Sequence, residues 1–446
     1  MRMLHSTVIA FLALALLAGV DCKPVAGVGS TERLNVLLIV LDDLNTSPGC
    51  YGNPVVKTPN IDLLAQRGAR FDRAYCQFSL CNPSRASFLS GLRPETTGVL
   101  NNKTPPRKKL KETVFLPELF RLHGYFTARV GKIAHDKYSE SVSWDISEGK
   151  DQIGSVLDPD CFGREWCATS NRDEDELDGR VARRIVRLLE ESRDRPFFIS
   201  AGFSLPHSPW YAPKKYFDLY PLGEIPLPAD FASSGAAAHE IRQSRAAYYA
   251  SLSFVDAQIG LIIGALDSLG LTRNTVVVFT SDHGFHLGEH GGIFDKRTLF
   301  EESVRVPLIV SAPGFPEAAV SPRIVELVDL FPTLTELCGL PGVDGLEGIS
   351  FVPLLSEPNR PWKSAAFSTA VKSKRVTRSV RTERYVYIED VNGGKPRLYD
   401  HETDPQESVN QAKNRQYADV LADMRRRLKE GWRGQSRPPR DVKRQD

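Results

Sequence analysis

The feature that most constrains the fold is a continuous apolar run, Asn35–Leu41 (NVLLIVL), which ends directly in two aspartates, Asp42 and Asp43. An unbroken apolar stretch of this length is typical of a strand buried on both faces, as in parallel sheets covered by helices. Such sheets bind ligands at the carboxyl ends of their strands. We therefore expect a parallel or mixed sheet with a functional site where this strand ends.

Strand and helix patterns alternate along most of the chain, which predicts an α/β fold with a large mixed or parallel sheet sandwiched by helices. Asp282 and His283 follow one of the strand-like runs and belong to the same sheet edge as Asp42 and Asp43. The further strand-like runs are Tyr125–Val130, Pro196–Phe203, Thr275–Thr280 and Val306–Ser311. The helical patterns are Asp62–Gly68, Leu116–His123, Asp178–Ser192 and Ser244–Leu269.

The pattern changes after about Phe351. Residues Ser379–Glu389 alternate in polarity like one antiparallel strand, and Asn392-Gly393 is a strong hairpin signal. A helical stretch, Gln416–Trp432, precedes a basic tail. We predict a leader over residues 1–22, a main domain over 31–355 that carries the candidate site, and a smaller C-terminal α+β subdomain over 356–446.

The N-terminus has the pattern of an export signal, because Arg2 precedes an apolar run, Val8–Val20, that ends at Asp21. The run is too short to span a bilayer comfortably, which favours a cleaved signal peptide over a membrane anchor. A lipid anchor on Cys22 is disfavoured by the neighbouring Asp21. No later segment looks apolar for long enough to span, so we expect a secreted or periplasmic protein without a transmembrane span.

Charge and cysteine content exclude several classes of protein. Lys plus Arg number 57 and Asp plus Glu number 55, which leaves a net charge of +2. A protein that binds nucleic acid with its whole surface is far more basic, so we expect no nucleic-acid partner. Seven cysteines are too few for a disulfide scaffold of this size, although an exported protein could pair Cys161 with Cys167. No Cys/His spacing suggests zinc.

The most specific string is Cys81-Asn82-Pro83-Ser84-Arg85. The residues that follow predict a short helix, Ser84–Ser90, so the cysteine and the arginine lie near a helix start. That position suits an anion, because helix-start N–H groups and the helix dipole favour negative charge. For a lone cysteine, a buried structural role is the alternative.

This string resembles the Cys-x-Pro-Ser-Arg motif in which sulfatases oxidise the cysteine to formylglycine, and the chain resembles the sulfatase family over nearly its whole mature length. Within the family it is most similar to the iduronate-2-sulfatase branch. The resemblance implies an alkaline-phosphatase-like fold and a formylglycine-generating enzyme as a partner during maturation. The other segments that carry it are LIVLDDLNTSPGCYGNPVVKTPNIDLLAQRG, LSGLRPETTG, LPELFRLHGYFTARVGKIAH, SLPHSPWYAPKKY, VVFTSDHGFHLGEHG and LYDHETDPQES.

The resemblance implies one calcium ion per chain. Asp42 and Asp43 are similar to the family's first pair of metal ligands, and Asp282 and His283 to the second, with the formylglycine of Cys81 bound to the same ion. Oxygen-rich ligation suits calcium, whereas a histidine nitrogen is an unusual ligand for it. The iduronate branch nevertheless has a histidine at this place. For either pair alone, capping of a strand end is the competing interpretation.

The resemblance also implies the catalytic roles. A hydroxyl of the hydrated formylglycine attacks sulfur and forms a covalent sulfate, while Arg85 holds that hydroxyl. Lys132 and His135 are similar to the pair that removes the second hydroxyl's proton and releases sulfate. His207 and Lys296 are similar to the residues that hold the sulfate and protonate the leaving oxygen.

Two departures from the iduronate pattern bear on the substrate. One extra residue precedes Lys296, and Phe285 stands where the branch has a tryptophan. The implied function is hydrolysis of sulfate esters of carbohydrates, with iduronate 2-sulfate or a related sulfated polysaccharide unit as the substrate.

Three alternatives remain open at this stage. They are a sulfatase for a sulfated hexosamine, a phosphate-ester or phosphonate hydrolase of the same superfamily, and a glycan-binding protein on an inactive scaffold. Phosphomonoesterases usually carry extra Asp and His ligands for two zinc ions, and the sequence shows no such surplus. An inactive scaffold predicts the loss of catalytic residues, and none of the expected types is missing.

Overall fold

The computed structural model describes residues 33–434 except 136–137, 139–142 and 232–234. The described residues belong to one compact unit. The predicted signal peptide, Cys22 and most of the basic tail lie outside the described residues. By composition α9 (Ala236–Ser268) could cross a membrane, contrary to our expectation that no segment after the N-terminus could; 72% of its most apolar stretch is buried inside the protein.

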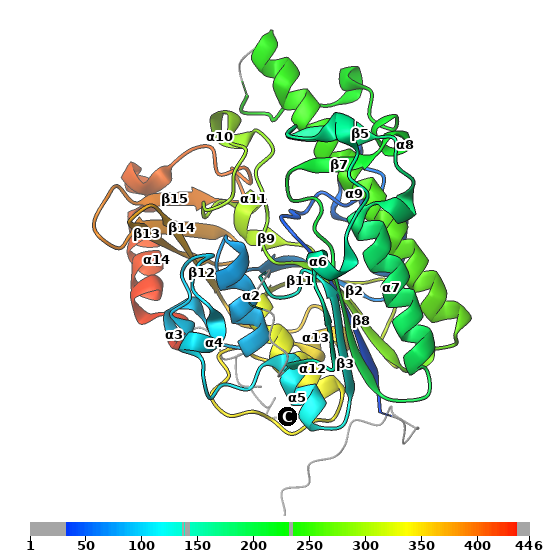
Figure 1. Ribbon diagram of the computed structural model, residues 1–446. Coiled ribbons are helices and arrows are strands. Elements are labelled where there is room, and N and C mark those ends of the chain that lie inside the picture. The colour runs from blue at the N-terminus through cyan, green and yellow to red at the C-terminus, as the bar shows by residue number, and fades with distance from the viewer. Residues whose placement is uncertain (1–32, 136–137, 139–142, 232–234, 435–446) are drawn as a thin grey trace, which may run out of the picture. The chain divides into compact units, whose positions relative to one another are not determined.

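A large mixed sheet forms the centre of this unit, and helices cover both of its faces (Figure 1). The expected α/β architecture is therefore confirmed. The five strands from β8 to the edge strand β4 run parallel to one another, whereas β10 is antiparallel to β8 and to β2. The order is β11 (Ala319–Glu326), β2 (Ala69–Tyr75), β10 (Leu308–Ser311), β8 (Thr275–Ser281), β1 (Asn35–Leu41), β6 (Phe197–Gly202), β3 (Phe126–Gly131) and β4 (Ile146–Glu148).

The strand β1 shows why its sequence is continuously apolar. Leu37 and Ile39 belong to the core on one face of the sheet, whereas Val36 and Leu38 belong to the core on the other face. Both faces are dry, so neither set of side chains can be polar. The first core is closed by α1 (Pro59–Gln66), α7 (Leu177–Ser192) and α9; the second by α2 (Cys81–Ser90), α5 (Leu116–Leu122), α12 (Leu330–Leu337) and α13 (Val352–Ser356).

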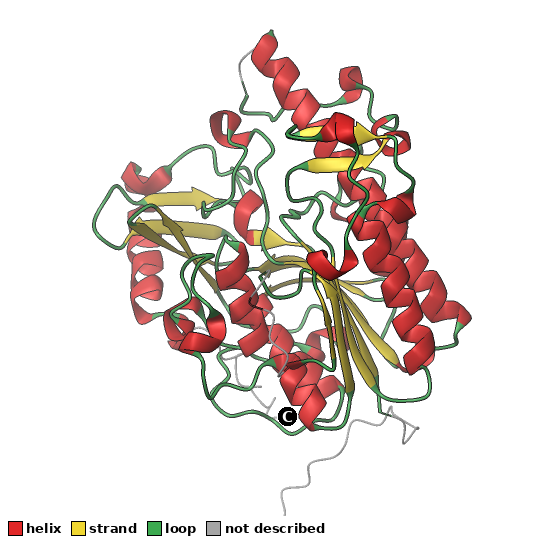
Figure 2. Ribbon diagram, viewed as in Figure 1, coloured by secondary structure: helices red, strands yellow, loops and turns green. Residues whose placement is uncertain are grey.

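A four-stranded antiparallel sheet follows near the C-terminus, with one long helix against it (Figure 2). Its strands are β12 (Ala366–Lys372), β13 (Arg375–Arg381), β14 (Tyr385–Asp390) and β15 (Arg397–Asp400), and the helix is α14 (Ala418–Glu430). The single strand predicted over Ser379–Glu389 is wrong, because a turn at residues 382–384 folds it into the β13–β14 hairpin. The hairpin expected at Asn392-Gly393 joins β14 to β15.

Shorter elements complete the unit. Val306–Ser311, predicted as one strand, is divided at Pro307 into β9 (Arg305–Val306) and β10. A disulfide joins Cys161 and Cys167 beside the small sheet of β5 (Trp166–Thr169) and β7 (Trp210–Pro213). The remaining short helices are α3 (Pro94–Thr97), α4 (Pro106–Lys109), α6 (Lys150–Ile153), α8 (Lys214–Phe217), α10 (Glu289–Gly292) and α11 (Glu301–Val304).

Candidate active site

Two pairs of polar residues, Asp42–Asp43 and Asp282–His283, lie side by side at the carboxyl end of the large sheet. The parallel strands β1 and β8 are in register through Leu41 and Ser281, so the residues that follow them are neighbours. The backbone N–H of Asp43 donates to Asp282 Oδ1 at 3.2 Å, which links the two strand ends directly. Asp42, Asp43, Asp282 and His283 are each no more than 1% exposed. Their carboxylates are therefore held in a region of low dielectric, where each negative charge needs a partner.

Cys81 is the first residue of α2, so the helix begins three residues before the predicted start at Ser84. Its Sγ lies 3.3 Å from His283 Nε2 and 3.4 Å from Lys296 Nζ, and the side chain is 1% exposed. Burial, together with the charge of Asp42, raises the pKa of the thiol well above its ordinary value. A protonated thiol is a weak nucleophile, so an unmodified Cys81 is poorly suited to attack an ester.

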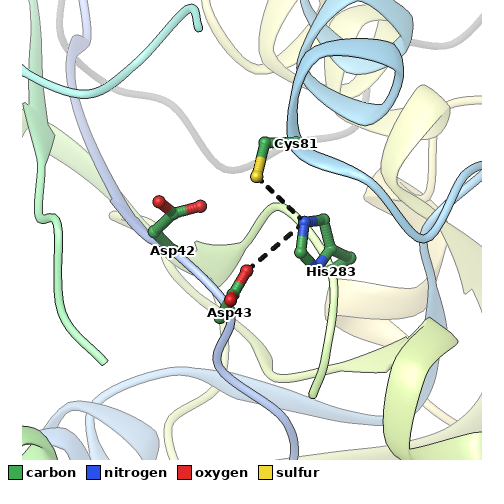
Figure 3. Close-up of side chains that lie close together, drawn as sticks. All are labelled: Asp42, Asp43, Cys81 and His283. Carbon is green, nitrogen blue, oxygen red and sulfur yellow. Dashed lines mark hydrogen bonds and ion pairs between the residues drawn. The ribbon is translucent and has the colours of Figure 1, made fainter. Parts of the chain in front are cut away.

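Four side chains could hold a metal ion at this point (Figure 3). Ligand atoms of Asp42, Asp43, Cys81 and His283 all lie within 4.8 Å of one another. Opposite ligands of calcium are about 4.6–5.2 Å apart, twice the usual bond length, so the group fits such an ion. His283 Nδ1 lies 2.9 Å from the carbonyl of Gly284 and must donate to it. This contact leaves the lone pair of the ring on Nε2, which faces the other three ligand side chains.

Asp282, expected as a fourth ligand from the protein, lies at the border of this group. Its Oδ2 is 3.6 Å from His283 Nε2, but it also accepts a hydrogen bond of 2.8 Å from Arg85 Nε. Arg85 is 1% exposed; it also donates to Asp42 Oδ1 at 3.3 Å and to the carbonyl of Ile133 at 3.0 Å. Its planar fork thus ties α2 to the ends of both strands and orients their carboxylates.

Two lysines supply the remaining charge. Lys296 Nζ donates to both carboxylate oxygens of Asp43, at 2.7 and 2.9 Å, and Lys132 Nζ donates to Asp42 Oδ2. Burial alone would raise the pKa of Asp42, but the charges of Lys132, His207 and Arg85 lower it well below its ordinary value. Both carboxylates therefore stay ionised at neutral pH, as metal ligands must be.

Two histidines stand at the open side of the site. His207 Nε2 lies 3.9 Å from Asp43 Oδ2, and its side chain is 35% exposed. His135 lines the same cavity as Cys81, Asp42 and Lys132; the cavity measures about 390 Å³. The structure thus gathers every site residue named from the sequence, either in direct contact or around this cavity. The roles assigned to them remain predictions.

The sequence analysis missed a second cavity of about 420 Å³, which shares Lys132, Lys150, Leu177 and Ser204 with the first. Arg129, which lines it, is 5% exposed, and no carboxylate among the described residues pairs with its guanidinium. The signal in the sequence was an arginine, the one charged residue of the strand Phe126–Gly131.

Comparisons with known proteins agree with this geometry. The sulfatase family profile matches residues 34–340, and the profile of the N-sulphoglucosamine sulphohydrolase C-terminal region matches residues 288–433. A sulfatase of Formosa agariphila is 32% identical over 86% of this chain and 84% of its own length. The iduronate 2-sulfatase of Mus musculus is 33% identical over 74% of each chain.

Solved structures show the same fold. A protein described as a 2-O glycosaminoglycan sulfatase superposes with a TM-score of 0.74 at 27% identity, over 90% of this chain and 92% of its own. The phosphonate monoester hydrolase of Agrobacterium radiobacter superposes with a TM-score of 0.79 at 24% identity, over 90% of this chain and 96% of its own. The likeness to the hydrolase extends to the fold alone.

Proposed function

The chain belongs to the sulfatase family, and we propose that it removes the 2-O-sulfate of a uronic acid, with iduronate 2-sulfate in a sulfated polysaccharide as its substrate. Hydrolysis of sulfuric esters follows from the family. The finer assignment is supported by the likeness to the mouse enzyme and to the 2-O-sulfatase structure, and by the charges that surround the cavity.

One observation carries the proposal: Cys81 begins α2, contacts His283 and Lys296, and lines a cavity together with Asp42. Three buried carboxylates, Asp42, Asp43 and Asp282, face three fixed cations, Arg85, Lys132 and Lys296. The site is therefore balanced by itself, and a divalent ion would make it positive. A positive, partly dehydrated site favours an anionic ester and the charge that develops as its bond breaks.

Two groups implied by the family would supply the reacting parts. Formylglycine at position 81 supplies a hydrated aldehyde with a nucleophilic hydroxyl, and calcium lowers the pKa of that hydroxyl and neutralises sulfate oxygens. Asp42, Asp43 and His283 would hold the ion, with Asp282 as a further ligand that Arg85 orients. Because Cys81 is almost fully buried, we propose that the formylglycine-generating enzyme acts before the chain has folded.

The lysines and histidines of the chain would bind the ester and transfer the protons. Lys296 and Lys132 would bind the ester oxygens, since both reach the residues around position 81. His207 Nδ1 contacts the carbonyl of Ser208 and must donate to it, so a proton for the leaving oxygen would come from Nε2 of the imidazolium. Its Nε2 lies 3.9 Å from Asp43 Oδ2, on the side of the site where the ester would lie. His135 would accept the proton from the second hydroxyl at position 81.

Arg129 supports a uronic acid rather than a hexosamine. Its guanidinium donates to Ser147 Oγ at 2.9 Å and to the carbonyl of Gly131 at 2.7 Å, but its positive charge has no acidic partner among the described residues. A substrate carboxylate in the second cavity would neutralise that charge. Lys150 lines both cavities and adds a second cation. The carboxylates of Glu176 and Asp178 line only the first cavity, and Asp151 is the one carboxylate that lines the second. A substrate with an ester in one cavity and a carboxylate in the other fits this arrangement.

The test compares sulfate release from a disaccharide that ends in 2-sulfated iduronate with release from 6-sulfated hexosamine sugars. We expect preference for the uronate. Replacing Arg129 by Gln should lower kcat/KM for the uronate by roughly 10- to 100-fold, because a charge-assisted contact is worth about 1.5–3 kcal/mol. Turnover of a small aryl sulfate, which has no carboxylate, should not change. Equal losses on both substrates would contradict the assignment of Arg129.

A sulfated hexosamine is the second candidate, because the N-sulphoglucosamine sulphohydrolase profile matches the C-terminal part of the chain. Preference for the 6-sulfated hexosamine would favour it. Release of phosphonate at a higher rate than sulfate would favour the phosphonate hydrolase instead.

We further propose that the protein acts outside the cytoplasm. The disulfide between Cys161 and Cys167 supports this location, because such bonds persist in oxidising compartments. Determination of the mature N-terminus from the native host tests it; an uncleaved chain recovered from the cytoplasm would contradict it.

A further inference from the structure

A second group of ligand-bearing side chains lies farther along the segment that carries His283. Ligand atoms of His286, His290 and Glu302 lie within 4.8 Å of one another. They line no part of the cavity around Cys81. We propose that these three residues form a second metal site, suited to zinc, with a water molecule as the fourth ligand. Two imidazoles and one carboxylate are a ligand set that zinc accepts readily.

His286 is the residue that points most clearly to a ligand. It is fully buried, and its Nδ1 makes no hydrogen bond but lies 3.8 Å from Glu302 Oε2. Its other nitrogen, Nε2, contacts Thr298 Oγ1 at 2.7 Å, and this hydroxyl in turn donates to Ser303 Oγ at 2.9 Å. The hydroxyl therefore accepts from Nε2–H, which leaves the Nδ1 lone pair free. Histidines that bind metals are usually oriented in this way, by a hydrogen bond from the other ring nitrogen.

The distances fit tetrahedral coordination. His290 Nε2 lies 3.1 Å from Glu302 Oε2, and His286 Nδ1 lies 3.8 Å from the same oxygen. Zinc bonds of about 2.0–2.1 Å place tetrahedral ligands about 3.4 Å apart, between these two values. The ring of His290 stacks on Phe300 with 3.8 Å between centroids, which fixes its orientation. Little movement is needed for all three atoms to share one ion.

Among the described residues, the negative charge of Glu302 is not neutralised by a lysine or an arginine. In the part of the chain that the structure describes, no lysine or arginine forms an ion pair with it. The Glu302 side chain is only 19% exposed, and a largely buried carboxylate without a fixed cation beside it is costly. A divalent ion would supply the positive charge that the buried carboxylate lacks.

A third group shows the contrast. Glu301, His401 and Glu407 also have ligand atoms within 4.8 Å of one another. There the guanidinium of Arg381 already binds Glu301 at 2.7 Å and Glu407 at 2.9 Å. A fixed cation therefore takes the place that a metal would need, so this group is a structural ion pair network.

Solvent can reach the proposed site from one side. The side chains of His290 and Glu302 are 10% and 19% exposed, whereas that of His286 is fully buried. Glu302 also lines a separate cavity of about 250 Å³. A water molecule from this cavity could complete the coordination of the ion.

The proposed ion would act on a catalytic side chain from outside the active site. The backbone N–H of His286 donates at 3.1 Å to the carbonyl of Asp295, the residue directly before Lys296. An ion bound by His286 and Glu302 would therefore join both ends of the segment that carries Lys296. Because Lys296 Nζ binds the carboxylate of Asp43, the ion would help to hold this lysine in place.

The experiment uses the full chain, freed of metals with a chelator and returned to a buffer with saturating calcium. Zinc bound per chain is measured by elemental mass spectrometry, and Co²⁺ is added in parallel as a spectroscopic probe. We expect one tightly bound zinc per chain and the visible absorption of tetrahedral Co²⁺. The variants His286→Gln and Glu302→Gln should weaken zinc binding by roughly 100-fold, and Thr298→Val by roughly 10-fold.

His401→Gln is the matched control, because it removes a histidine from the group that Arg381 already fills; it should bind zinc like the unaltered chain. Circular dichroism checks that each variant is folded. If His286→Gln does not fold, Glu302→Gln and Thr298→Val decide the question. A folded chain that binds no zinc in calcium buffer would overturn the proposal. So would zinc binding that is unchanged in Glu302→Gln, because the metal would then lie elsewhere.

Discussion

Two pairs of acidic residues follow strands of the same sheet, and they have opposite surroundings. Asp42 and Asp43 follow β1, near the middle of the sheet, while Glu326 ends β11 at its edge and Asp329 comes three residues later. All four side chains are almost fully buried. Both pairs are also bound by arginine and lysine, so charge and burial alone do not distinguish them.

The second pair, Glu326 and Asp329, is surrounded by partners within the protein. Arg93 binds both oxygens of Glu326, at 2.8 and 2.6 Å, and Lys363 Nζ lies 2.9 Å from Glu326 Oε2 and also binds Asp329. The N–H of Phe367, on β12, donates to Glu326 Oε1 at 3.0 Å. These contacts fasten the C-terminal sheet to the large one. None of the four charged residues lines a cavity described above.

The first pair differs in three respects: it faces a cavity, it contacts His283, and it lies beside Cys81. The comparison shows that an acidic pair after a strand becomes a site when reactive groups and open space accompany it. Where these are missing, an acidic pair after a strand stabilises the fold through its ion pairs. Changes at the first pair should therefore alter chemistry, and changes at the second should alter stability.

The largest expected effect is on chemistry. Replacing Cys81 by Ala should lower turnover of any sulfate ester by about 10⁴-fold or more, as loss of a nucleophile does in other hydrolases. The melting temperature should stay close to that of the unaltered chain, because only the polar end of one small side chain is removed. Initial rates and thermal melts measure both. Substantial residual turnover would remove residue 81 from the mechanism.

The opposite result is expected at the second pair. Glu326→Gln should lower the free energy of unfolding by about 3–5 kcal/mol, because it leaves Arg93 and Lys363 buried without a full counter-charge. Turnover per folded molecule should not change. Glu383→Gln is the matched control, since its ion pair with Arg323 is partly exposed and worth about 1 kcal/mol or less. Urea unfolding measures each; similar losses in both variants would contradict the comparison.

Low pH should weaken the stabilisation that Glu326 gives through its ion pairs with Arg93 and Lys363. Burial alone would raise the pKa of Glu326, but Arg93 and Lys363 lower it from its ordinary 4.5 to about 2. A lowered pKa in the folded state stabilises the protein above pH 4.5, and this contribution is lost as the pH falls towards 2. The loss is at most about 3 kcal/mol. Burial raises the pKa of Asp329, which offsets part of it. Unfolding at about pH 6 and about pH 3 should differ less for Glu326→Gln than for the unaltered chain.

The smallest expected effect is the stabilisation of the chain by calcium, which should depend on the first acidic pair and not on the second. Calcium at about 100 times its Kd should stabilise the chain by about 2.7 kcal/mol. Asp43→Asn should abolish this increment, whereas Glu326→Gln should retain it. Thermal melts with and without calcium measure the difference. An increment that survives in Asp43→Asn would place the ion elsewhere.

Strongly patterned parts of the fold could be predicted from the sequence. β1 and β8 are buried throughout and mostly apolar because both faces of the sheet are covered. Their ends position Asp42, Asp43, Asp282 and His283. The two edge-side strands β2 and β11 were missed, because several of their residues are polar and only partly buried. Their pattern therefore does not differ from that of a loop.

Features that depend on tertiary contact could not be predicted. The acidic residues of VELVDL, Glu326 and Asp329, follow a strand as Asp42 and Asp43 do, and only the structure shows that Arg93 and Lys363 fill their surroundings. The spacing of His286 and His290 would suit one helix face, but the backbone there is not helical. Glu302 joins them from another element, so the group has no sequence signature.

The most direct test of the central claim relates activity to the modification of residue 81. The chain is produced with and without a formylglycine-generating enzyme, and the converted fraction is measured by peptide mass spectrometry. Sulfate release from 2-sulfated iduronate is then plotted against that fraction. The account predicts a straight line through the origin, with no turnover by the unconverted chain. Equal activity at all converted fractions would contradict it, because the nucleophile would then not be a modified Cys81.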